Sequence, residues 1–215
     1  MVKSSHSPIN LIYARSPEYS ANSIYYVEGY ALIKNITVNK SIVVHYTYDN
    51  KCWHNSHAKL LTLTNDNHEI WHFKTPNTTT YNSCSFALFY SDDNNEYWDN
   101  NQNINYTLKW YSPTKILNNC VIILDKAIKN PTNLYGNILI KHPTYHKQVK
   151  VRYSFDNWET FQEINATHST QLENHLENWI FFVPISFASN IKFIVYCIID
   201  GITYYDNNFE KNYLI

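Results

Sequence analysis

An internal repeat constrains this chain more than any other feature of its sequence. Residues 97–101 read YWDNN and are followed by Asn105-Tyr106, whereas residues 204–208 read YYDNN and are followed by Asn212-Tyr213, an offset of 107 residues in both cases. The same offset relates VHYTYDN at 44–50 to VRYSFDN at 151–157. Solenoid repeats have periods of only about 20–50 residues, so a repeat of this length indicates a duplicated domain.

Each copy has the pattern of an all-β domain. Short segments rich in β-branched and aromatic residues alternate with polar turns, and no segment carries a sustained helical stripe. We therefore predict two tandem immunoglobulin-like antiparallel β-sandwiches, with module one at residues 1–112, module two at 117–215, and a linker around SPTK at 112–115. The strands are expected at 24–34, 41–48, 69–74, 83–90, 120–128, 135–141, 148–155, 178–185, 191–199 and 202–205.

Charge and cysteine content exclude several classes of function. A formal charge of −1 and a pI near 6.8 provide no basic footprint for nucleic acid or an anionic membrane. The four cysteines do not recur with the repeat and fit no zinc spacing, so we expect free thiols in a reducing compartment. Without a recognisable signal peptide or transmembrane segment we expect a cytoplasmic protein, or a secreted one if the chain is a fragment.

A zinc-protease pattern occurs at His68-Glu69-Ile70-Trp71-His72. That chemistry requires a helix, which brings the two histidines to one face, whereas this segment has the composition of a strand. Positions i and i+4 of a strand lie roughly 13 Å apart, too far for both imidazoles to bind one zinc. Because no other catalytic constellation is present, we predict no metal, no cofactor and no enzymatic activity. An enzyme remains open only if the chain is a fragment of a longer amylolytic protein.

The repeated segment combines aromatic rings with Asp and Asn. Flat apolar faces beside fixed hydrogen-bond donors and acceptors suit a sugar ring, which has an apolar face and a hydroxyl rim. The alternative is a polar turn whose tyrosine is anchored in the core. For one copy the two interpretations are about equal, and the presence of two copies favours binding.

The residues of both copies resemble carbohydrate-binding modules of family 21, the starch- and glycogen-binding type. The resemblance rests on Asp49-Asn50 with Trp53, on Asp156-Asn157-Trp158, and on the two Asp-Asn-Asn segments closed by Asn-Tyr. Such modules occur in fungal amylolytic enzymes and in glycogen-targeting subunits of protein phosphatase 1. The resemblance implies an eight-stranded immunoglobulin-like sandwich.

The resemblance also implies binding residues. Trp53 with Trp98, and Trp158 with Tyr205, would form stacking platforms, and Trp158 is expected to be fully exposed. Tyr145 would supply a second site in module two, where module one has Val38. A further family aromatic is replaced by Ala87 and Ile194, so each platform is expected to lack a ring. The complete set of predicted carbohydrate-binding residues is Trp53, Tyr97, Trp98, Asp99, Asn100, Asn105, Tyr145, Trp158, Tyr204, Tyr205, Asp206, Asn207 and Asn212.

We expect non-catalytic binding of α-1,4-glucan, namely starch, glycogen or malto-oligosaccharides, with two modules providing avidity. The alternative is a glycogen-targeting regulatory subunit that binds the protein phosphatase 1 catalytic subunit or glycogen synthase. Phosphatase docking requires a basic residue, then Val or Ile, any residue, and Phe or Trp. The only near matches are Ile180-Phe181-Phe182 and Ile191-Lys192-Phe193, which lack the basic residue and lie in predicted strands.

Overall fold

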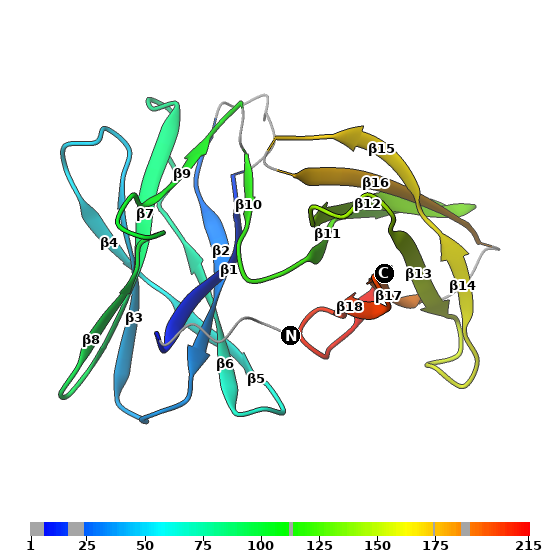
Figure 1. Ribbon diagram of the computed structural model, residues 1–215, viewed down its shortest axis with the longest axis horizontal. Coiled ribbons are helices and arrows are strands. Elements are labelled where there is room, and N and C mark those ends of the chain that lie inside the picture. Colours follow the sequence, from blue (N-terminus) through cyan, green and yellow to red (C-terminus); the bar gives the residue numbers. More distant parts are fainter. Residues whose placement is uncertain (1–6, 17–23, 112–113, 174, 186–189) are drawn as a thin grey trace. The chain divides into compact units, whose positions relative to one another are not determined.

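The chain consists of two β-sandwich units. The computed structural model describes residues 7–16, 24–111, 114–173, 175–185 and 190–215, and divides the chain into 1–119 and 120–215, called module one and module two below. Every regular element in the described residues is a strand, and all strand pairs are antiparallel (Figure 1). Within these residues no helix could cross a bilayer. The all-β prediction is confirmed.

Module one pairs two five-stranded sheets. The first has the order β10 (Lys115–Leu117), β1 (Ile9–Arg15), β2 (Glu28–Lys34), β6 (His68–Lys74) and β5 (Lys59–Leu63). The second has the order β4 (His54–His57), β3 (Lys40–Thr47), β7 (Ser83–Asp92) and β8 (Glu96–Asp99), and β9 (Tyr106–Lys109) also pairs with β7.

Module two repeats this topology except for β10, which has no counterpart among its described strands. Its first sheet has the order β11 (Ile122–Lys129), β12 (Asn133–Lys141), β16 (Leu176–Pro184) and β15 (Thr167–Gln171). Its second has the order β14 (Gln162–Asn165), β13 (Gln148–Ser154), β17 (Lys192–Ile199) and β18 (Ile202–Asp206), with β19 (Tyr213–Leu214) also on β17. The repeat in the sequence is therefore a repeat of topology, and the second sheet of each module carries the Asp-Asn-Asn segment at the end of its β8 or β18 strand.

The module boundary lies later in the chain than the sequence indicated. Residues 115–117 form β10, which pairs with β1 of module one, and Leu117 is fully buried there. The division falls between Asn119 and Cys120, whereas we had placed the end of module one at 112 and the start of module two at 117. Three residues are too short a strand to show a periodic pattern, so only the pairing with β1 reveals it. Residues 112 and 113 of the predicted linker lie outside the described residues.

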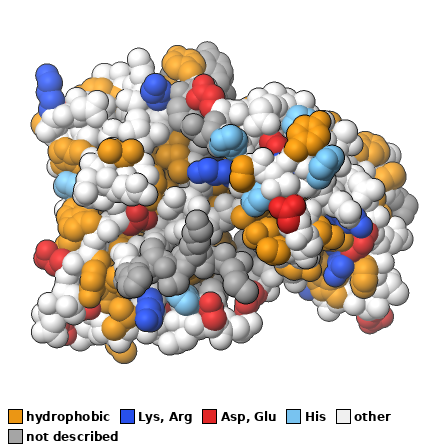
Figure 2. Space-filling model, viewed as in Figure 1, with side chains coloured by type: hydrophobic (Ala, Val, Ile, Leu, Met, Phe, Trp, Pro, Cys, Tyr) orange, Lys and Arg blue, Asp and Glu red, His pale blue; other side chains and the backbone are white. Residues whose placement is uncertain are grey.

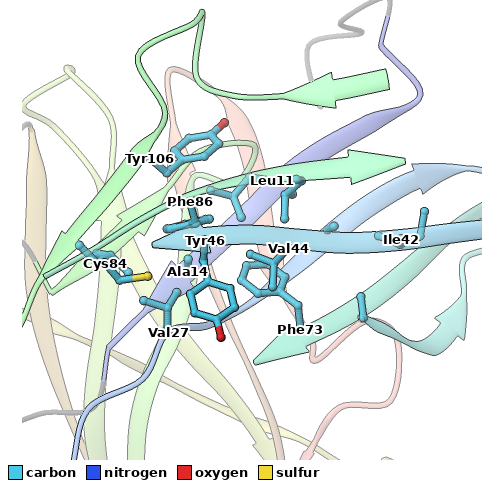
Figure 3. Packing of buried hydrophobic residues seen from close by; sticks show 14 of the residues in the cluster. Leu11, Ala14, Val27, Ile42, Val44, Tyr46, Phe73, Cys84, Phe86 and Tyr106 are labelled. Atoms are coloured by element: carbon cyan, nitrogen blue, oxygen red, sulfur yellow. The ribbon is translucent and has the colours of Figure 1, made fainter. Parts of the chain in front are cut away.

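Alternation along the strands builds the core of each module. In module one Val44 and Tyr46 of β3 point inward with Phe86 of β7, against Leu11 and Phe73 of the opposite sheet (Figure 3). Fully burying one such side chain contributes about 1.5–3 kcal/mol. The core of module two is built in the same way from Val151, Phe181, Val183, Phe193 and Val195. None of the four cysteines is part of a disulfide, in agreement with the prediction.

Two of the three glycines are matched by the repeat and have the same packing role. A Cβ at Gly29 would lie 2.5 Å from the Tyr13 carbonyl oxygen and 2.6 Å from Cζ of Phe73. At Gly136 it would lie 2.2 Å from the Lys126 carbonyl oxygen and 2.8 Å from the Phe181 ring. Both glycines are therefore required by a close approach of backbone and ring.

Candidate functional site

The outer face of the second sheet in module one carries a continuous row of rings. Trp98 of β8 packs on Phe89 of β7, with ring centroids 4.6 Å apart, and meets the edge of His45 of β3 at 5.7 Å. His45 stacks on Trp53 at 4.8 Å with an angle of 11° between the ring planes. Trp53 and Trp98 are 38% and 46% exposed. The structure thus joins the two predicted tryptophans, through His45, in one surface.

Strand pairing explains this row. Phe89 lies directly opposite Trp98 in the β7–β8 ladder, and His45 lies opposite Asn55 in the β3–β4 ladder. Side chains directly opposite each other in antiparallel strands point to the same face and come close together. His45 Nδ1 lies 2.6 Å from Asn55 Oδ1, which fixes the orientation of the imidazole. We call Trp53, His45, Phe89 and Trp98 the module one platform.

Module two carries a corresponding row with different chemistry. Tyr205 of β18 stacks on Tyr196 of β17 at 5.5 Å and 30°. The Arg152 guanidinium of β13 lies 5.4 Å from the centre of the Tyr196 ring and 4.6 Å from that of Phe161. Tyr205 and Phe161 are 54% and 55% exposed. We call Tyr205, Tyr196, Arg152 and Phe161 the module two platform.

Trp158 does not match the expectation of a fully exposed ring. The residue is only half-exposed, and its indole Nε1 is buried. Its backbone has φ of 74°, a left-handed conformation that is rare for a bulky residue, and its N–H donates to Ser154 Oγ at 2.8 Å. No ring contact joins it to Tyr205 among the described residues, whereas Phe161 approaches Arg152.

Five residues of the platforms were missed from the sequence. We expected each platform to lack a ring because Ala87 and Ile194 replace a family aromatic, but Phe89 and Tyr196 supply one two residues further along the same strand. The second pair is His45 and Arg152, at matched positions of the 107-residue repeat. Period-two alternation places residues 87 and 89 on the same face, so this signal was available. Phe161 has no repeat partner and no comparable signal.

The predicted aspartates serve the fold. Asp99 accepts hydrogen bonds from Leu11 N at 2.6 Å and the Tyr106 hydroxyl at 2.8 Å. Asp206 accepts from Leu124 N at 2.6 Å, from the Tyr213 hydroxyl at 2.7 Å and from Asn208 N at 3.1 Å. Their carboxylates are thus committed to contacts within each module, and we leave them out of the proposed sugar-binding set.

The two strand amides concerned lie at β-bulges. The register of β1 on β2 shifts between Leu11 and Tyr13, and that of β11 on β12 shifts between Leu124 and Lys126. A bulge interrupts the ladder and leaves a strand N–H without its usual partner, which the aspartate replaces. The conserved spacing within the repeat therefore reflects a structural bond between the two sheets of each sandwich.

The first aromatic residue of each copy of the repeated motif points inward. Tyr97 packs on the core of module one beside Tyr90, and Tyr204 packs on the core of module two. Residues on a strand alternate between faces, so Trp98 and Tyr205 must point outward when their neighbours point inward. The structure therefore separates each predicted aromatic pair into a core residue and a platform residue.

Beside each platform lies a loop in left-handed conformation. Asn101, Gln102 and Asn103 have φ of 52°, 59° and 71°, and Asn208, Phe209 and Glu210 have φ of 54°, 54° and 69°. Non-glycine residues rarely adopt this conformation, and Asn tolerates it best. This preference explains part of the high Asn content of both motifs.

The loop asparagines divide into two groups. Asn100 Oδ1 accepts from Asn103 N and Asn207 Oδ1 accepts from Glu210 N, both at 3.0 Å, so these oxygens cap the loops. Asn105 and Asn212 donate only their backbone N–H, to the carbonyls of Asn100 and Asn207. The side-chain amides of Asn105 and Asn212 are half-exposed and make no hydrogen bond within the described residues. Of the predicted set, these two have the largest unused hydrogen-bonding capacity.

Tyr145 lies apart from the module two platform. It occupies the loop between β12 and β13, is 87% exposed, and meets the ring of His146 edge-on at 5.3 Å. Buried Lys147 holds this loop, because its Nζ contacts the Thr144 carbonyl and lies 2.8 Å from Glu177. The matched residue of module one, Val38, is 94% exposed and offers no ring.

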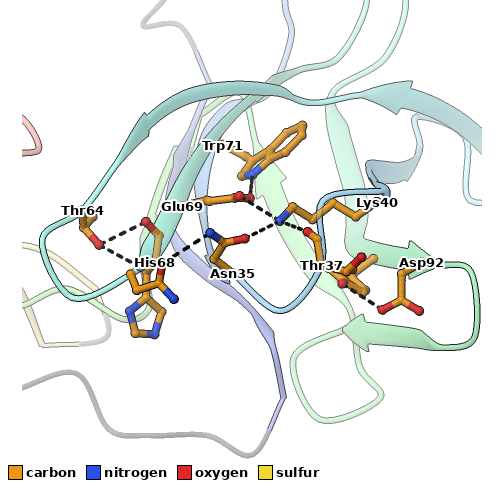
Figure 4. Close-up of polar contacts among 10 residues, drawn as sticks. Asn35, Thr37, Lys40, Thr64, His68, Glu69, Trp71 and Asp92 are labelled. Atoms are coloured by element: carbon orange, nitrogen blue, oxygen red, sulfur yellow. Dashed lines mark hydrogen bonds and ion pairs between the residues drawn. The ribbon is translucent and has the colours of Figure 1, made fainter.

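Glu69 of the apparent zinc-protease motif forms a structural ion pair, and module two contains the equivalent pair. Glu69 lies 2.8 Å from Lys40 Nζ and accepts the indole N–H of Trp71 at 2.8 Å (Figure 4). His68 contacts Asp66 at 3.2 Å, whereas the His72 ring lies against Tyr30. No cluster of three His, Cys, Asp or Glu side chains suited to a metal occurs in the described part of the chain. In module two Glu177 accepts from Trp179 and pairs with Lys147 in the same way.

Charge on the surface is dispersed. On the face shown in Figure 2, basic and acidic side chains lie scattered among each other, and apolar and histidine side chains are exposed between them. The net charge of −1 agrees with this pattern. A ligand of these surfaces is therefore selected by local groups and not by a long-range field.

Comparison with known proteins identifies one family. The model of the carbohydrate/starch-binding module, family 21, matches the chain twice, at residues 9–109 and 116–215. The first match lies within module one, and the second covers all of module two and begins in β10, the last strand of module one.

Several relatives match over one module length. Protein phosphatase 1 regulatory subunit 3B of Homo sapiens is 30% identical over 105 residues, which are 46% of this chain and 34% of that protein. Regulatory subunit 3C of Clarias batrachus is 26% identical over 107 residues, 47% of this chain and 37% of that protein. The matched part spans about a third of these relatives. The starch-binding domain of Rhizopus oryzae glucoamylase, solved with β-cyclodextrin and maltoheptaose, is 28% identical with a TM-score of 0.42, covering 46% of this chain and 96% of that structure.

Proposed function

This chain belongs to the family 21 carbohydrate/starch-binding modules, and from that premise we propose that its two ring platforms bind α-1,4-glucan without catalysis. The observation that carries the proposal is the module one platform. Four rings are joined side by side on an outer sheet face, and both of its tryptophans are substantially exposed. Exposed rings that pack on one another form a flat apolar surface, which suits the apolar face of a sugar.

The platform crosses the sheet from strand to strand. Its members come from β8, β7, β3 and the loop before β4, and neighbouring strands lie about 4.8 Å apart. The surface therefore extends for roughly 14 Å across the strands, long enough for a short run of consecutive sugar rings and too long for one. The same extent applies from β18 to β14 in module two.

Hydrogen bonding supplies orientation. Asn105 and Asn212 follow the left-handed loops beside Trp98 and Tyr205, and their amides are not used within the modules. An amide has both a donor and an acceptor, which matches the vicinal hydroxyls of glucose. We assign these two residues, together with the side-chain nitrogen of Asn207, to sugar hydroxyls. The exposed ring of Tyr145 is the proposed second contact of module two.

Affinity at one site should be modest. Each ring adds only about 1 kcal/mol beyond area burial, so we expect one platform to bind weakly, with a dissociation constant of order 10–1000 μM. Two modules on one chain give a local concentration of roughly millimolar for the second contact. Retention on a polymer therefore arises from two weak sites acting together.

The direct test is depletion of the protein by amylopectin and glycogen, with cellulose as the control polymer. We expect retention on both α-glucans and none on cellulose. The double variant Trp98→Ala/Tyr205→Ala should lose retention by more than the two single losses combined, because avidity needs both platforms. Equal retention on cellulose, or unchanged retention of the double variant, would refute the proposal.

A second candidate is a glycogen-targeting role for a phosphatase, which the phosphatase regulatory subunits among the relatives favour. Of the two near matches to a docking segment, Ile191 and Phe193 are fully buried, whereas Ile180 and Phe182 are exposed on β16. The β12 strand pairs with β16 along its whole length, whereas β15 pairs with it only from Glu177 to Ile180, so the β15 ladder does not reach Phe182. Co-precipitation of the phosphatase 1 catalytic subunit with the full chain, with and without Phe182→Ala, tests this candidate.

A further inference from the structure

The two platforms differ in charge at matched positions. Outward-facing positions of β3, β4, β7 and β8 correspond by strand pairing to those of β13, β14, β17 and β18. Five of these positions change charge between modules, and they are Val43 to Lys150, His45 to Arg152, Asn55 to Glu163, Ser85 to Lys192, and Glu96 to Thr203. At these five positions, with histidine counted as neutral, module one carries one acid, whereas module two carries three bases and one acid.

Arg152 is held at the centre of the module two platform by Glu163. Its Nε and Nη2 both lie 2.7 Å from Glu163 Oε1, and that carboxylate also accepts the Tyr196 hydroxyl at 2.8 Å. Burial raises the pKa of Tyr196 to about 12, so the hydroxyl remains a donor at neutral pH. The guanidinium is thereby fixed between the rings of Tyr196 and Phe161.

The pairing of Arg152 with Glu163, called the clamp below, leaves donors of the guanidinium available for a ligand. A guanidinium has five N–H donors, and the two bonds to Glu163 use two of them. The Arg152 side chain is 33% exposed and that of Lys150 is 27% exposed. Lys150 Nζ lies 3.9 Å from Glu163, which is a weak contact, so one carboxylate faces two nearby cations.

We propose that module two takes α-glucan carrying anionic substituents, phosphate monoesters in particular, and that Arg152 is the residue that sets this preference. The inference rests on the proposed function, because the sugar ring must lie on the platform for its rim to approach the cations. Substituents replace hydroxyls at the rim of the ring, and a fixed guanidinium fork suits phosphate oxygens. Module one, whose matched position holds His45, is expected to take neutral glucan.

The test compares phosphate-bearing amylopectin with the same polymer after enzymatic dephosphorylation. The protein is the full chain with Trp98→Ala, which weakens module one and leaves module two as the main site. We expect about threefold tighter binding to the phosphorylated polymer at low salt, falling toward parity near 0.5 M salt, where exposed charges are screened. Inorganic phosphate at millimolar concentration should reduce the difference.

Substitutions at position 152 separate charge from geometry. Arg152→His, which installs the module one residue, should weaken binding of both polymers, because Arg152 is part of the platform, and should remove most of the difference in affinity between them. Arg152→Lys should retain part of it, because it keeps the charge and loses the fork. Lys150→Gln, which leaves the Arg152–Glu163 clamp intact, should weaken the preference by less than Arg152→His. A melting comparison identifies any variant that fails to fold.

The outcomes distinguish this inference from the proposed function. Equal affinity for the two polymers, with both bound, would overturn the inference and leave glucan binding standing. Binding of the phosphorylated polymer alone, sensitive to Arg152→His, would support the inference and refute binding of neutral glucan by module two. A preference unchanged in both Arg152→His and Lys150→Gln would also overturn the inference.

Discussion

The turn that carries the tryptophan differs between the modules, and this difference shows how two inserted residues change a binding surface. In module one Lys51 and Cys52 separate the Asp-Asn pair from Trp53, and the Trp53 ring stacks on His45. In module two Trp158 follows Asn157 directly, takes φ of 74° and has its indole nitrogen buried. The same sequence motif therefore supplies a platform ring in one module and a half-buried turn residue in the other.

The rings are distributed between the modules differently from what the resemblance implied. The resemblance implied that module two had the more complete site, because it keeps Trp158, Tyr205 and Tyr145. The structure instead gives module one the continuous ring surface and gives module two a surface completed by an arginine and Phe161. Four predictions test this comparison.

The largest effect is expected on stability, from the aspartates that the two modules share. Asp206→Ala removes three hydrogen bonds, which Leu124 N, the Tyr213 hydroxyl and Asn208 N donate. It should cost about 3 kcal/mol of unfolding free energy. Asp99→Ala, which removes two hydrogen bonds and not three, should cost about 2 kcal/mol.

Hydrogen exchange read by mass spectrometry localises these losses. Asp99→Ala should accelerate exchange in β1 and its sheet, and Asp206→Ala in β11 and its sheet, each sparing the other module. Exposed Asp93, for which the structure shows no bond among its described residues, provides the matched control as Asp93→Ala. Unchanged protection in β1 and β11 would show that the carboxylates are not structural.

The next effect concerns Trp98 on β8 and Tyr205 on β18, the residues at matched ends of the two platforms. Trp98→Ala should cost about 2 kcal/mol in binding of maltoheptaose at module one, and Tyr205→Ala about 1 kcal/mol at module two, because the indole offers the larger face. Titration calorimetry on the full chain measures both. Tyr135→Ala is the control, since this exposed tyrosine lies on the other sheet of module two. A loss for Tyr135→Ala equal to that for Tyr205→Ala would contradict the assignment.

A smaller effect separates the tryptophans of the two turns. Trp53→Ala should weaken binding by about 1 kcal/mol with little change in melting, because the ring is partly exposed and contributes stacking surface. Trp158→Ala should instead lower the stability of module two by about 1 kcal/mol and change binding less. Paired melts and titrations decide between the two roles. If Trp158→Ala removes binding while the melt is unchanged, the ring is part of the platform after all.

The smallest effect is a property that the two turns share. Hydrogen bonds from Cys52 N lower the pKa of Asp49 to about 2, and those from Thr160 lower the pKa of Asp156 to about 2. Both values lie below the ordinary 3.8, so the stabilisation is complete above pH 4 and is lost as the pH falls from about 4 to about 2.

Amide chemical shifts report this titration. The Cys52 and Thr160 amides should move together with midpoints near pH 2, and Asp49→Asn should remove the Cys52 transition while leaving that of Thr160. Midpoints near pH 4 in both turns would contradict the hydrogen bonding described above.

The sequence by itself determined the architecture and the location of the candidate surface. The 107-residue repeat required two similar domains, and alternation of apolar and polar residues placed ten strands close to their observed positions. It also predicted that His68 and His72 lie on a strand, which is confirmed by β6, and the structure assigns Glu69 to an ion pair with Lys40. These conclusions follow from local periodicity, which neighbours in sequence fix.

Only the tertiary structure decided which members of the motif face outward on the sheet and which face the core. Asp99 and Asp206 had the composition of a polar site, but their partners lie in a strand remote in sequence and become visible only when the two sheets pack together. Strand pairing likewise brought Phe89, Tyr196, His45 and Arg152 beside the predicted rings. The orientation of Trp158 depended on a left-handed backbone angle, which no composition or spacing specifies. Contacts across a sandwich are set by register and packing, and these are properties of the assembled fold.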